Sequence, residues 1–328
     1  RIGRLHITNL VQSVPQAEVV AIADPFLNDD TIAYAKDLGI ENCSKDPQDI
    51  FANPDIDAVF VCTSTDAHAE MIRRAAETGK HVFCEKPIHT DLDKIREAIA
   101  ATEKAGVKLQ VGFVRRFDHN HKKVHDVVAS GKLGAPLVAH CAHRNANYPA
   151  QYDDVVAVTG TAIHEIDTMA WLVGDYFTKA QVIFPKCSRH SKNENLHDPQ
   201  IVMLTTSSGM VISCEIWVNC QYAYDIRCEV LCEDGTATLP RPSRVDVCTN
   251  QTHYKGMTTD GLGYFAEAYD REFQAWADAC NAGTYCKAAA SAWDGYCAAV
   301  TTDSCLKSQK SGAIEAVPLT DRPDFYID

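Results

Sequence analysis

The sequence lacks the features that would place this protein in a membrane or on nucleic acid. Its 328 residues contain no apolar run long enough to span a bilayer, and no secretory signal is recognisable. Acidic residues outnumber basic ones, 44 to 31, for a formal net charge of -13. Non-specific binding to nucleic acid or to anionic membranes needs basic patches. We therefore predict a soluble cytoplasmic protein with no nucleic-acid or membrane partner.

Paired cysteine motifs are also absent, although the chain has 14 cysteines. No Cys-x-x-Cys occurs, and the closest pair, Cys228 and Cys232, lies on strand-like sequence. This scatter favours small buried side chains in a reducing compartment over disulfides, and no metal is expected. Repeats and low-complexity segments are lacking too. The length suits two domains, and 46% hydrophobic residues can form their cores.

A first strand and the first two glycines of a dinucleotide-binding fingerprint are missing as well. Ile2 and Gly3 open directly into an apolar-periodic helix, and residues 18–24 predict a buried strand that ends in Asp24. Asp24 follows Gly3 by 21 residues, the spacing from the last fingerprint glycine to the acid that binds the adenosine ribose. Gly3 could also simply begin a helix. We expect a short N-terminal segment in the working protein to supply the missing strand.

Strand and helix patterns then alternate as far as residue 113. The predicted strands are 56–62, 81–84 and 107–113, and the predicted helices are 31–38, 70–77 and 91–105. This repetition with short turns is typical of a doubly wound parallel sheet. The hydroxyl-rich turn Thr63-Ser64-Thr65 could cap the next helix or approach a cofactor, and the two roles are compatible.

Beyond Arg115 the pattern changes to strands joined by hairpins. Strands are predicted at 137–144, 178–184, 201–206, 210–218, 223–232 and 236–239, and helices at 120–130, 164–173, 265–279 and 288–307. Hairpin-linked strands indicate a mainly antiparallel sheet. We therefore predict an α/β domain over residues 1–115 and an α+β domain over residues 116–328.

Lys86 occupies a conspicuous place after the strand 81–84 and directly before Pro87. A residue before proline is disfavoured in a helix, and only X-Pro bonds adopt the cis form readily. The carboxyl ends of strands in open α/β sheets are also where ligands bind. Taken alone, however, Lys86 is most simply a solvated lysine in a turn.

His164 and Asp167 lie three residues apart in the predicted helix 164–173, so they share one face. Histidine is the natural base for removing an alcohol proton near neutral pH. A neighbouring carboxylate could raise its basicity or hold a substrate hydroxyl. The simpler alternative is a polar pair on the helix surface.

Taken together, these motifs resemble the Gfo/Idh/MocA oxidoreductases, most closely their inositol 2-dehydrogenase branch, over essentially the whole chain. The residues that carry the resemblance are Arg1-Ile2-Gly3 with His6, Asp24-Pro25, Glu85-Lys86-Pro87, Val111–Asp118, His143-Arg144-Asn145, Ala162–Asp167 and Tyr222–Glu229. The resemblance implies an N-terminal Rossmann domain and a C-terminal domain with an open sheet. It also implies a homo-oligomer, a tetramer or larger, in which this sheet packs against a neighbour's.

The resemblance further implies hydride transfer from a secondary carbinol of a cyclic polyol to NAD. Lys86 would bond the reacting oxygen, and His164 would take the hydroxyl proton. The implied substrate-binding residues are Arg115, Asn145, Asp167, Tyr224 and Tyr269. The implied cofactor-binding residues are Ile2, Gly3, Asp24, Thr63, Ser64, His68, Glu85 and Lys86. NAD is favoured over NADP because Pro25, beside Asp24, offers no positive charge to a 2′-phosphate.

Gly160 departs from the family pattern, which places an aspartate four residues before the histidine. A glycine cannot pair with the imidazole of His164. The chain could be a catalytically impaired NAD-binding protein, or space at Gly160 could admit a sugar or glycoside oxidised at a glucosyl hydroxyl. Alternatively, Asp153, Asp154 or Asp167 could take the role. The presence of both Lys86 and His164 favours an enzyme over a non-catalytic NAD sensor.

Overall fold

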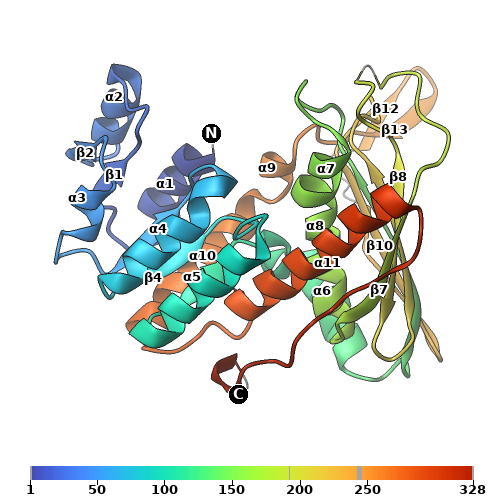
Figure 1. Ribbon diagram of the computed structural model, residues 1–328. Helices are drawn as coiled ribbons and strands as arrows, with labels where there is room; N and C mark the ends of the chain where they lie inside the picture. The colour runs from blue at the N-terminus through green and yellow to red at the C-terminus, as the bar shows by residue number, and fades with distance from the viewer. Residues whose placement is uncertain (1, 192, 242–245, 327–328) are drawn as a thin grey trace. The chain divides into compact units, whose positions relative to one another are not determined.

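The computed structural model describes residues 2–191, 193–241 and 246–326, so Arg1 of the predicted motif lies outside it (Figure 1). The chain divides into two compact units. Unit 1 comprises Arg1–Phe117, Glu267–Tyr296 and Arg322–Asp328, and unit 2 comprises Asp118–Ala266 and Cys297–Asp321. The chain therefore passes into unit 2 close to residue 115 and later returns to unit 1.

Unit 1 is built on a four-stranded sheet with the order β14-β5-β4-β3. Its strands β3 (Ala58–Val61), β4 (His81–Cys84) and β5 (Leu109–Val111) are parallel, and β14 (Ala290–Ser291) is antiparallel to β5. A separate parallel pair joins β1 (Ala21–Ala23) to β2 (Asn42–Ser44). The predicted parallel α/β architecture is confirmed. The strand before Asp24 is shorter than predicted because only three of its residues pair.

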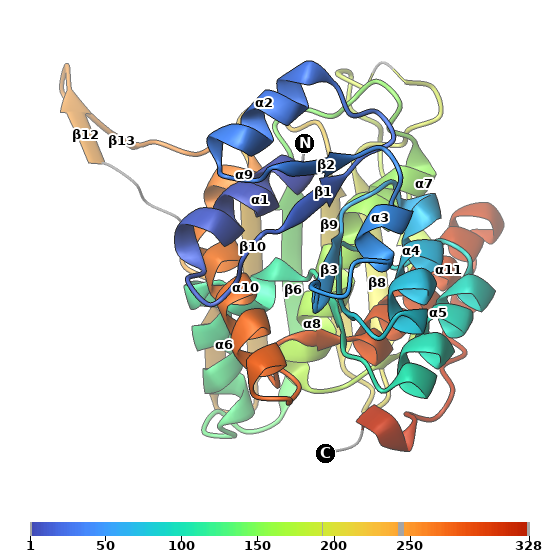
Figure 2. The ribbon, with the colours of Figure 1, turned by 90° about the vertical axis from the view of Figure 1, so that its left-hand side faces the viewer.

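Four helices of unit 1 follow the predicted alternation, one short helix was not predicted, and the last was predicted for the second domain (Figure 2). They are α1 (Ile2–Ser13), α2 (Asp29–Asp37), α3 (Gln48–Phe51), α4 (Thr65–Glu77), α5 (Leu92–Ala105) and α10 (Ala266–Asn281), with short 3-10 turns η1 (Val114–Phe117) and η3 (Asp324–Tyr326). Gly106 ends α5 in the left-handed conformation, with φ 67°, which a glycine adopts without steric cost.

An aromatic cluster fixes α10 to the sheet of unit 1. The Phe60 and Phe83 rings stack at 4.6 Å across the β3–β4 pair. The Phe273 ring from α10 meets both edge-on, at 5.2 Å and 5.3 Å. Burying large aromatic side chains in this geometry is strongly stabilising. It explains why a segment distant in sequence belongs to unit 1.

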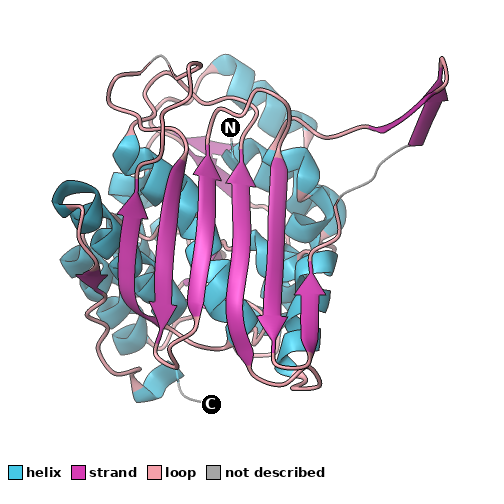
Figure 3. Ribbon diagram, turned by 90° about the vertical axis from the view of Figure 1, so that its right-hand side faces the viewer, coloured by secondary structure: helices cyan, strands magenta, loops and turns pink. Residues whose placement is uncertain are grey.

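Unit 2 is built on a seven-stranded sheet with the order β11-β10-β6-β9-β8-β7-β15 (Figure 3). Its strands are β6 (Pro136–Arg144), β7 (Phe177–Ile183), β8 (Gln200–Thr206), β9 (Val211–Trp217), β10 (Asp225–Cys232), β11 (Gly235–Thr238) and β15 (Glu315–Ala316). Neighbours are antiparallel except β6 and β9, which are parallel. The prediction of a mainly antiparallel sheet is confirmed.

The helices of unit 2 pack on one face of this sheet. They are α6 (His119–Ala129), α7 (Asp154–Val156), α8 (Ile163–Val173), α9 (Gly261–Tyr264) and the later part of α11 (Ala292–Ser311). A π-helical turn, η2 (Ala157–Ala162), leads directly into α8. Within the described ranges, no helix is both long and apolar enough to cross a membrane.

A hairpin of β12 (Asp246–Thr249) and β13 (Thr252–Lys255) stands away from the rest of unit 2 (Figure 2). The sequence analysis missed it. Its two loop residues, Asn250 and Gln251, have φ of 46° and 58°. Both positive values suit a tight hairpin turn, but Asn-Gln lacks the glycine that usually signals one.

The cysteines behave largely as predicted. Eight of the 14 are buried, namely Cys84, Cys141, Cys214, Cys220, Cys228, Cys232, Cys297 and Cys305. Cys141 lies opposite both Cys214 and Cys228 on neighbouring strands. A hydrogen bond to Cys214 and burial raise the pKa of the Cys141 thiol, which keeps it protonated.

Candidate active site

Lys86 lies immediately beyond β4, with a cis peptide bond to Pro87. Its side chain is half-buried. Burial lowers the pKa of Lys86, the Arg115 guanidinium lowers it further, and the Glu85 carboxylate opposes both. A lowered pKa brings an ammonium group closer to exchanging its proton near neutral pH. Lys86 is therefore not an ordinary solvated turn lysine.

Glu85 is held by a buried histidine from α1. The His6 Nε2 atom lies 2.6 Å from Glu85 Oε1, and His6 is 1% exposed. Burial pushes the pKa of Glu85 upward, but the hydrogen bond and charge of His6 and the charge of Lys86 outweigh it, so the pKa lies below its usual value. The His6 ring also packs against Tyr269 at 5.4 Å. This contact was not predicted, because residue 6 and residue 85 are far apart in sequence.

Arg115 is almost completely buried in η1, the turn that follows β5. Its neighbour Arg116 is also buried, and it lies 3.4 Å from the Asp294 carboxylate and donates to the Ala289 carbonyl. Arg116 therefore anchors η1 to the segment around β14. Arg115 is the arginine whose charge acts on Lys86.

Three of the residues predicted to hold a dinucleotide lie beyond the carboxyl ends of β1 and β3. Asp24 is exposed, and its Oδ1 accepts a hydrogen bond from the Phe26 amide at 2.8 Å. Thr63 and Ser64 are exposed too. Ser64 is the N-cap residue of α4 but makes no side-chain capping bond, and α4 begins earlier than predicted, at Thr65. The capping role is therefore not observed for Ser64.

His68 has a different environment from these exposed residues. It is 2% exposed, and its Nδ1 and Nε2 lie 2.8 Å and 3.1 Å from the Pro87 and Thr63 carbonyl oxygens. The imidazole thus joins the turn after β3 to the turn that contains Lys86. We infer that His68 supports the predicted cofactor site by holding these two turns.

His164 lies in the first turn of α8, beside a second histidine from the sheet of unit 2. The His143 and His164 rings are 5.9 Å apart. His143 Nδ1 lies 3.2 Å from Glu165 Oε1, and both side chains are buried. The sequence analysis assigned no role to His143 or Glu165. The His143–Glu165 pair therefore joins β6 to α8 at the residue that directly follows His164.

The remaining predicted substrate residues of unit 2 are firmly held. Asp167 is 3% exposed in α8. The Asn145 amide donates to the Trp217 carbonyl, and its carbonyl accepts from the Cys220 amide. The Tyr224 ring meets His143 edge-on at 5.5 Å. Asn145 thus directly follows β6, and Tyr224 directly precedes β10.

Because Tyr224 is a predicted substrate residue, we expect Gly261→Ala to weaken polyol binding. A Cβ at Gly261 would lie 3.0 Å from Tyr224 Cζ and 3.1 Å from its hydroxyl, so the ring would have to move. A displacement of this size should raise the KM for substrate about 3- to 10-fold. Steady-state kinetics would measure it. Gly263→Ala is the matched control, because its Cβ would meet Asp260 only at 3.4 Å; an unchanged KM in Gly261→Ala would contradict the role of Tyr224.

The predicted site residues fall into two groups. Unit 1 contains Ile2, Gly3, Asp24, Thr63, Ser64, His68, Glu85, Lys86, Arg115 and Tyr269, and unit 2 contains Asn145, His164, Asp167 and Tyr224. The structure brings Lys86, Glu85 and Arg115 together within unit 1. Their approach to His164 stays a prediction. Among the residues described, no three His, Cys, Asp or Glu side chains are arranged to hold a metal ion.

Comparisons with known proteins identify the family. Residues 1–113 match the NAD-binding Rossmann fold, and residues 125–319 the C-terminal alpha/beta domain, of the oxidoreductase family Gfo/Idh/MocA. The chain belongs to the Gfo/Idh/MocA oxidoreductase family. It is an NAD-dependent dehydrogenase that acts on CH–OH groups, as the motifs around Lys86 and His164 predicted.

Individual relatives support this assignment over the full length. The chain is 42% identical to the inositol 2-dehydrogenase of Ralstonia nicotianae, with 99% of this chain and 96% of the relative covered. It is 39% identical to the inositol 2-dehydrogenase of Pseudomonas savastanoi pv. phaseolicola, with the same coverage. Its structure is similar to that of myo-inositol dehydrogenase from Lactobacillus casei in complex with NAD(H) and myo-inositol. That match has a TM-score of 0.94 at 34% identity and covers 99% and 96% of the two chains.

The residues present in unit 1 fit NAD. The first turn of α1 carries no acidic residue, so its amide groups suit a diphosphate. The exposed Asp24 carboxylate suits a ribose diol, and the Pro25 and Phe26 side chains that follow carry no positive charge for a 2′-phosphate. When bound, NAD accepts the hydride.

Proposed function

We propose that the protein oxidises one secondary hydroxyl of an inositol-like cyclic polyol to a ketone. The observation that carries this proposal is the environment of Lys86, a half-buried amine with a lowered pKa beside Arg115. Such an amine can donate a hydrogen bond to an alcohol oxygen and help to set its protonation. The full-length similarity to inositol 2-dehydrogenases supplies the substrate class.

In this proposal two side chains divide the chemistry. His164 takes the hydroxyl proton as the C–H bond transfers its electron pair as hydride, so an alcohol becomes a ketone. Lys86 steadies the oxygen on which negative charge develops. Arg115, in a buried turn, would fix the orientation of the ring.

Polyol recognition is assigned to a set of hydrogen-bond donors and acceptors. The proposed residues are Arg115, Asn145, Asp167, Tyr224 and Tyr269, of which Arg115, Asp167, Tyr224 and Tyr269 are at most 9% exposed. Buried polar groups discriminate strongly, because an analogue that lacks one hydroxyl leaves them unpaired. We propose that residues 1–115 chiefly bind NAD and residues 116–328 chiefly bind substrate.

The alternative substrate, a glucosyl hydroxyl of a sugar or glycoside, is not favoured by the relatives, which are inositol dehydrogenases. A direct assay separates the two. Purified protein would be incubated with NAD and myo-inositol, scyllo-inositol, glucose or an alkyl glucoside, and NADH followed by absorbance. We expect turnover with an inositol and at least about 10-fold lower kcat/KM with the sugars. Turnover with glucosides alone would reject the inositol assignment.

We further propose that the protein is a cytoplasmic homo-oligomer, a tetramer or larger, assembled through the open face of the unit 2 sheet. No helix in the described part of unit 2 covers this face (Figure 3). Val211, Ser213, Glu215 and Trp217 point to it, alternating with buried residues along β9. The free thiols fit a reducing compartment such as the cytoplasm.

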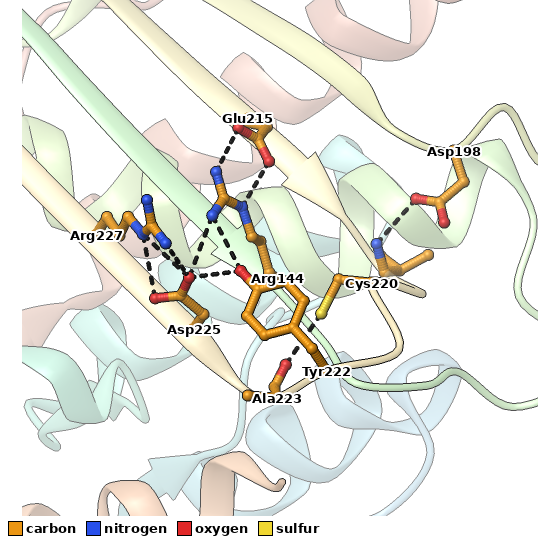
Figure 4. Close-up of polar contacts among 9 residues, drawn as sticks. Arg144, Asp198, Glu215, Cys220, Tyr222, Ala223, Asp225 and Arg227 are labelled. Carbon is orange, nitrogen blue, oxygen red and sulfur yellow. Dashed lines mark hydrogen bonds and ion pairs between the residues drawn. The ribbon is translucent and has the colours of Figure 1, made fainter. Parts of the chain in front are cut away.

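An ion-pair network gives this face a fixed pattern of charge (Figure 4). Arg144 makes two bonds to the Glu215 carboxylate, at 2.6 Å and 2.7 Å. Arg144 and Arg227 both bond Asp225, which also accepts a hydrogen bond from the Tyr222 hydroxyl. Asp225 is 1% exposed, so its charge is well shielded from water. A network of this kind can orient a partner that presents complementary charges.

We expect Val211→Glu to reduce the size of the assembly. Val211 is 39% exposed on the open face, and a buried carboxylate without a partner would weaken an interface there. Light scattering should give a wild-type mass near four times 36.1 kDa or more and a smaller mass for the variant. Val127→Glu on α6 is the matched control, with 44% exposure away from this face. A monomeric wild type would contradict the proposal.

A further inference from the structure

The space beside Gly160 is filled by a tyrosine hydroxyl. A Cβ built at Gly160 would lie 3.1 Å from Tyr152 Oη and 3.4 Å from Val156 Cγ1. The glycine therefore allows a close approach of the phenol to the helix. It does not open the empty space for a bulky substrate group that the sequence analysis considered.

Two of the carboxylates considered as replacements at this position are engaged elsewhere. Asp153 Oδ1 caps α7 by accepting from the Val156 amide at 2.8 Å. Asp154 accepts from the His197 amide, faces His197 Nδ1 at 2.7 Å and accepts from Gln200 at 2.8 Å. Their side chains serve the fold of the loop that precedes η2. The structure thus offers a phenol where the sequence analysis looked for a carboxylate.

Tyr152 is fixed in this position. Its hydroxyl lies 3.0 Å from the hydroxyl of Thr161, which is 2% exposed. Its amide donates to the Pro149 carbonyl, and its own carbonyl accepts from the Asn193 side chain. Burial raises the pKa of Tyr152, so the phenol is protonated and can donate a hydrogen bond.

The phenol touches the helix one turn before His164. Gly160 and Thr161 precede His164 by four and three residues, which is about one helical turn. The turn that contains them is π-helical, a rare form that often occurs at functional sites. Tyr152 Oη is close to both positions.

We propose that Tyr152 is a positioning residue for His164. Its neutral hydroxyl, with that of Thr161, supplies the polar group on the helix face before the imidazole and holds the ring in the orientation that accepts the substrate proton. This inference rests on the proposed function, in which His164 is the base. A phenol adds no negative charge beside the imidazole, which distinguishes this site from one with a carboxylate at position 160.

Tyr152→Phe tests the proposal, because it removes one oxygen and keeps the ring. With NAD and inositol, kcat should fall between about 10- and 100-fold while KM stays within about twofold. The stabilisation by NAD in a thermal-shift assay should not change. Tyr285→Phe is the matched control, because it also removes one tyrosine hydroxyl. The hydrogen bond lost there is the one to the Val107 carbonyl in unit 1, at 3.5 Å. Tyr285→Phe should keep wild-type kcat.

A rescue experiment separates positioning from a structural role. In Tyr152→Phe/Gly160→Asp the nearest remaining ring atom to the new Cβ is Cζ at 3.8 Å, an ordinary contact, so a carboxylate fits where the phenol oxygen was. The double variant should regain at least about 5-fold in kcat over Tyr152→Phe. Gly160→Asp alone should not improve on wild type, because its Cβ would crowd Tyr152 Oη at 3.1 Å.

Results that would reject this inference can be told apart from results that would reject the proposed function. A wild-type protein that reduces no NAD with any cyclic polyol would reject the proposed function and this inference with it. If the wild type is active, wild-type kcat in Tyr152→Phe would overturn the role of Tyr152 alone. A double variant no more active than Tyr152→Phe would overturn it as well.

Discussion

Lys86→Met should lower kcat for polyol oxidation by at least about 10³-fold while the protein stays folded and still binds NAD. Methionine keeps an unbranched side chain of nearly the same length, but it has no amine and cannot donate a hydrogen bond to the reacting oxygen. Lys86→Arg should not restore activity, since a guanidinium keeps its proton and would stand beside the Arg115 charge. Steady-state kinetics with an inositol and a thermal-shift assay with NAD would measure both effects.

Lys80 provides the matched control at the opposite end of β4. It is 4% exposed, and its Nζ donates to the Asn53 and Ile56 carbonyl oxygens at 2.6 Å and 2.8 Å. Lys80→Met should therefore lower stability and leave kcat of the folded protein unchanged. The assignment of Lys86 would be wrong if Lys86→Met retained more than about a tenth of wild-type kcat.

Local patterns predicted the elements of the fold well. Helix stops such as Gly106 and the apolar strands around Lys86 depend on neighbouring residues, so the sequence displays them directly. The return of α10 to unit 1 could not be predicted in this way. It depends on the packing of Phe273 against Phe60 and Phe83, which lie about 200 residues earlier in the chain.

The same distinction applies to the candidate site. The motif around Lys86 and the helical spacing of His164 and Asp167 were visible in the sequence. The His6–Glu85 bond and the His143–Glu165 pair join segments distant in sequence, and no local pattern reveals them. The contact of Tyr152 with Gly160 depends on a π-turn that residue spacing does not predict. Gly160 itself was the only sign of it, as a departure from the family pattern.

The protein should become less stable as the pH rises through about 6, because Asp198 then loses its proton in the folded state. The side chain is 1% exposed, its Oδ1 accepts from the Val218 amide at 2.9 Å, and its Oδ2 has no hydrogen-bond partner in the described structure. Burial raises the pKa of Asp198 from 3.8 to about 6, although hydrogen bonds from the Val218 and Asn219 amides oppose the shift. The acid is thus held where its ionised form is poorly solvated.

The sign follows from proton linkage. Between pH 3.8 and about 6 the folded protein holds a proton on Asp198 that the unfolded chain has lost, so protonation favours folding. Above pH 6 the folded protein must carry a buried carboxylate. Over the whole pH range this shift of about two pKa units lowers the free energy of unfolding by about 3 kcal/mol, and most of this loss falls between pH 4 and pH 6.

Asp198→Asn should remove this pH-dependent loss of stability, because the amide oxygen can still accept a hydrogen bond from Val218 and no charge forms. Urea denaturation of both proteins at pH 5, 6, 7 and 8 should show the variant gaining stability over wild type as the pH rises.

Asp175→Asn is a control of opposite sign. Hydrogen bonds from Ser207 and Ser208 outweigh burial and lower the pKa of Asp175. Removing the Asp175 carboxylate should therefore destabilise the protein at neutral pH, and the destabilisation should be smaller at acidic pH. A stability difference between Asp198→Asn and wild type that does not change with pH would show that Asp198 is already ionised at pH 5 in the folded protein.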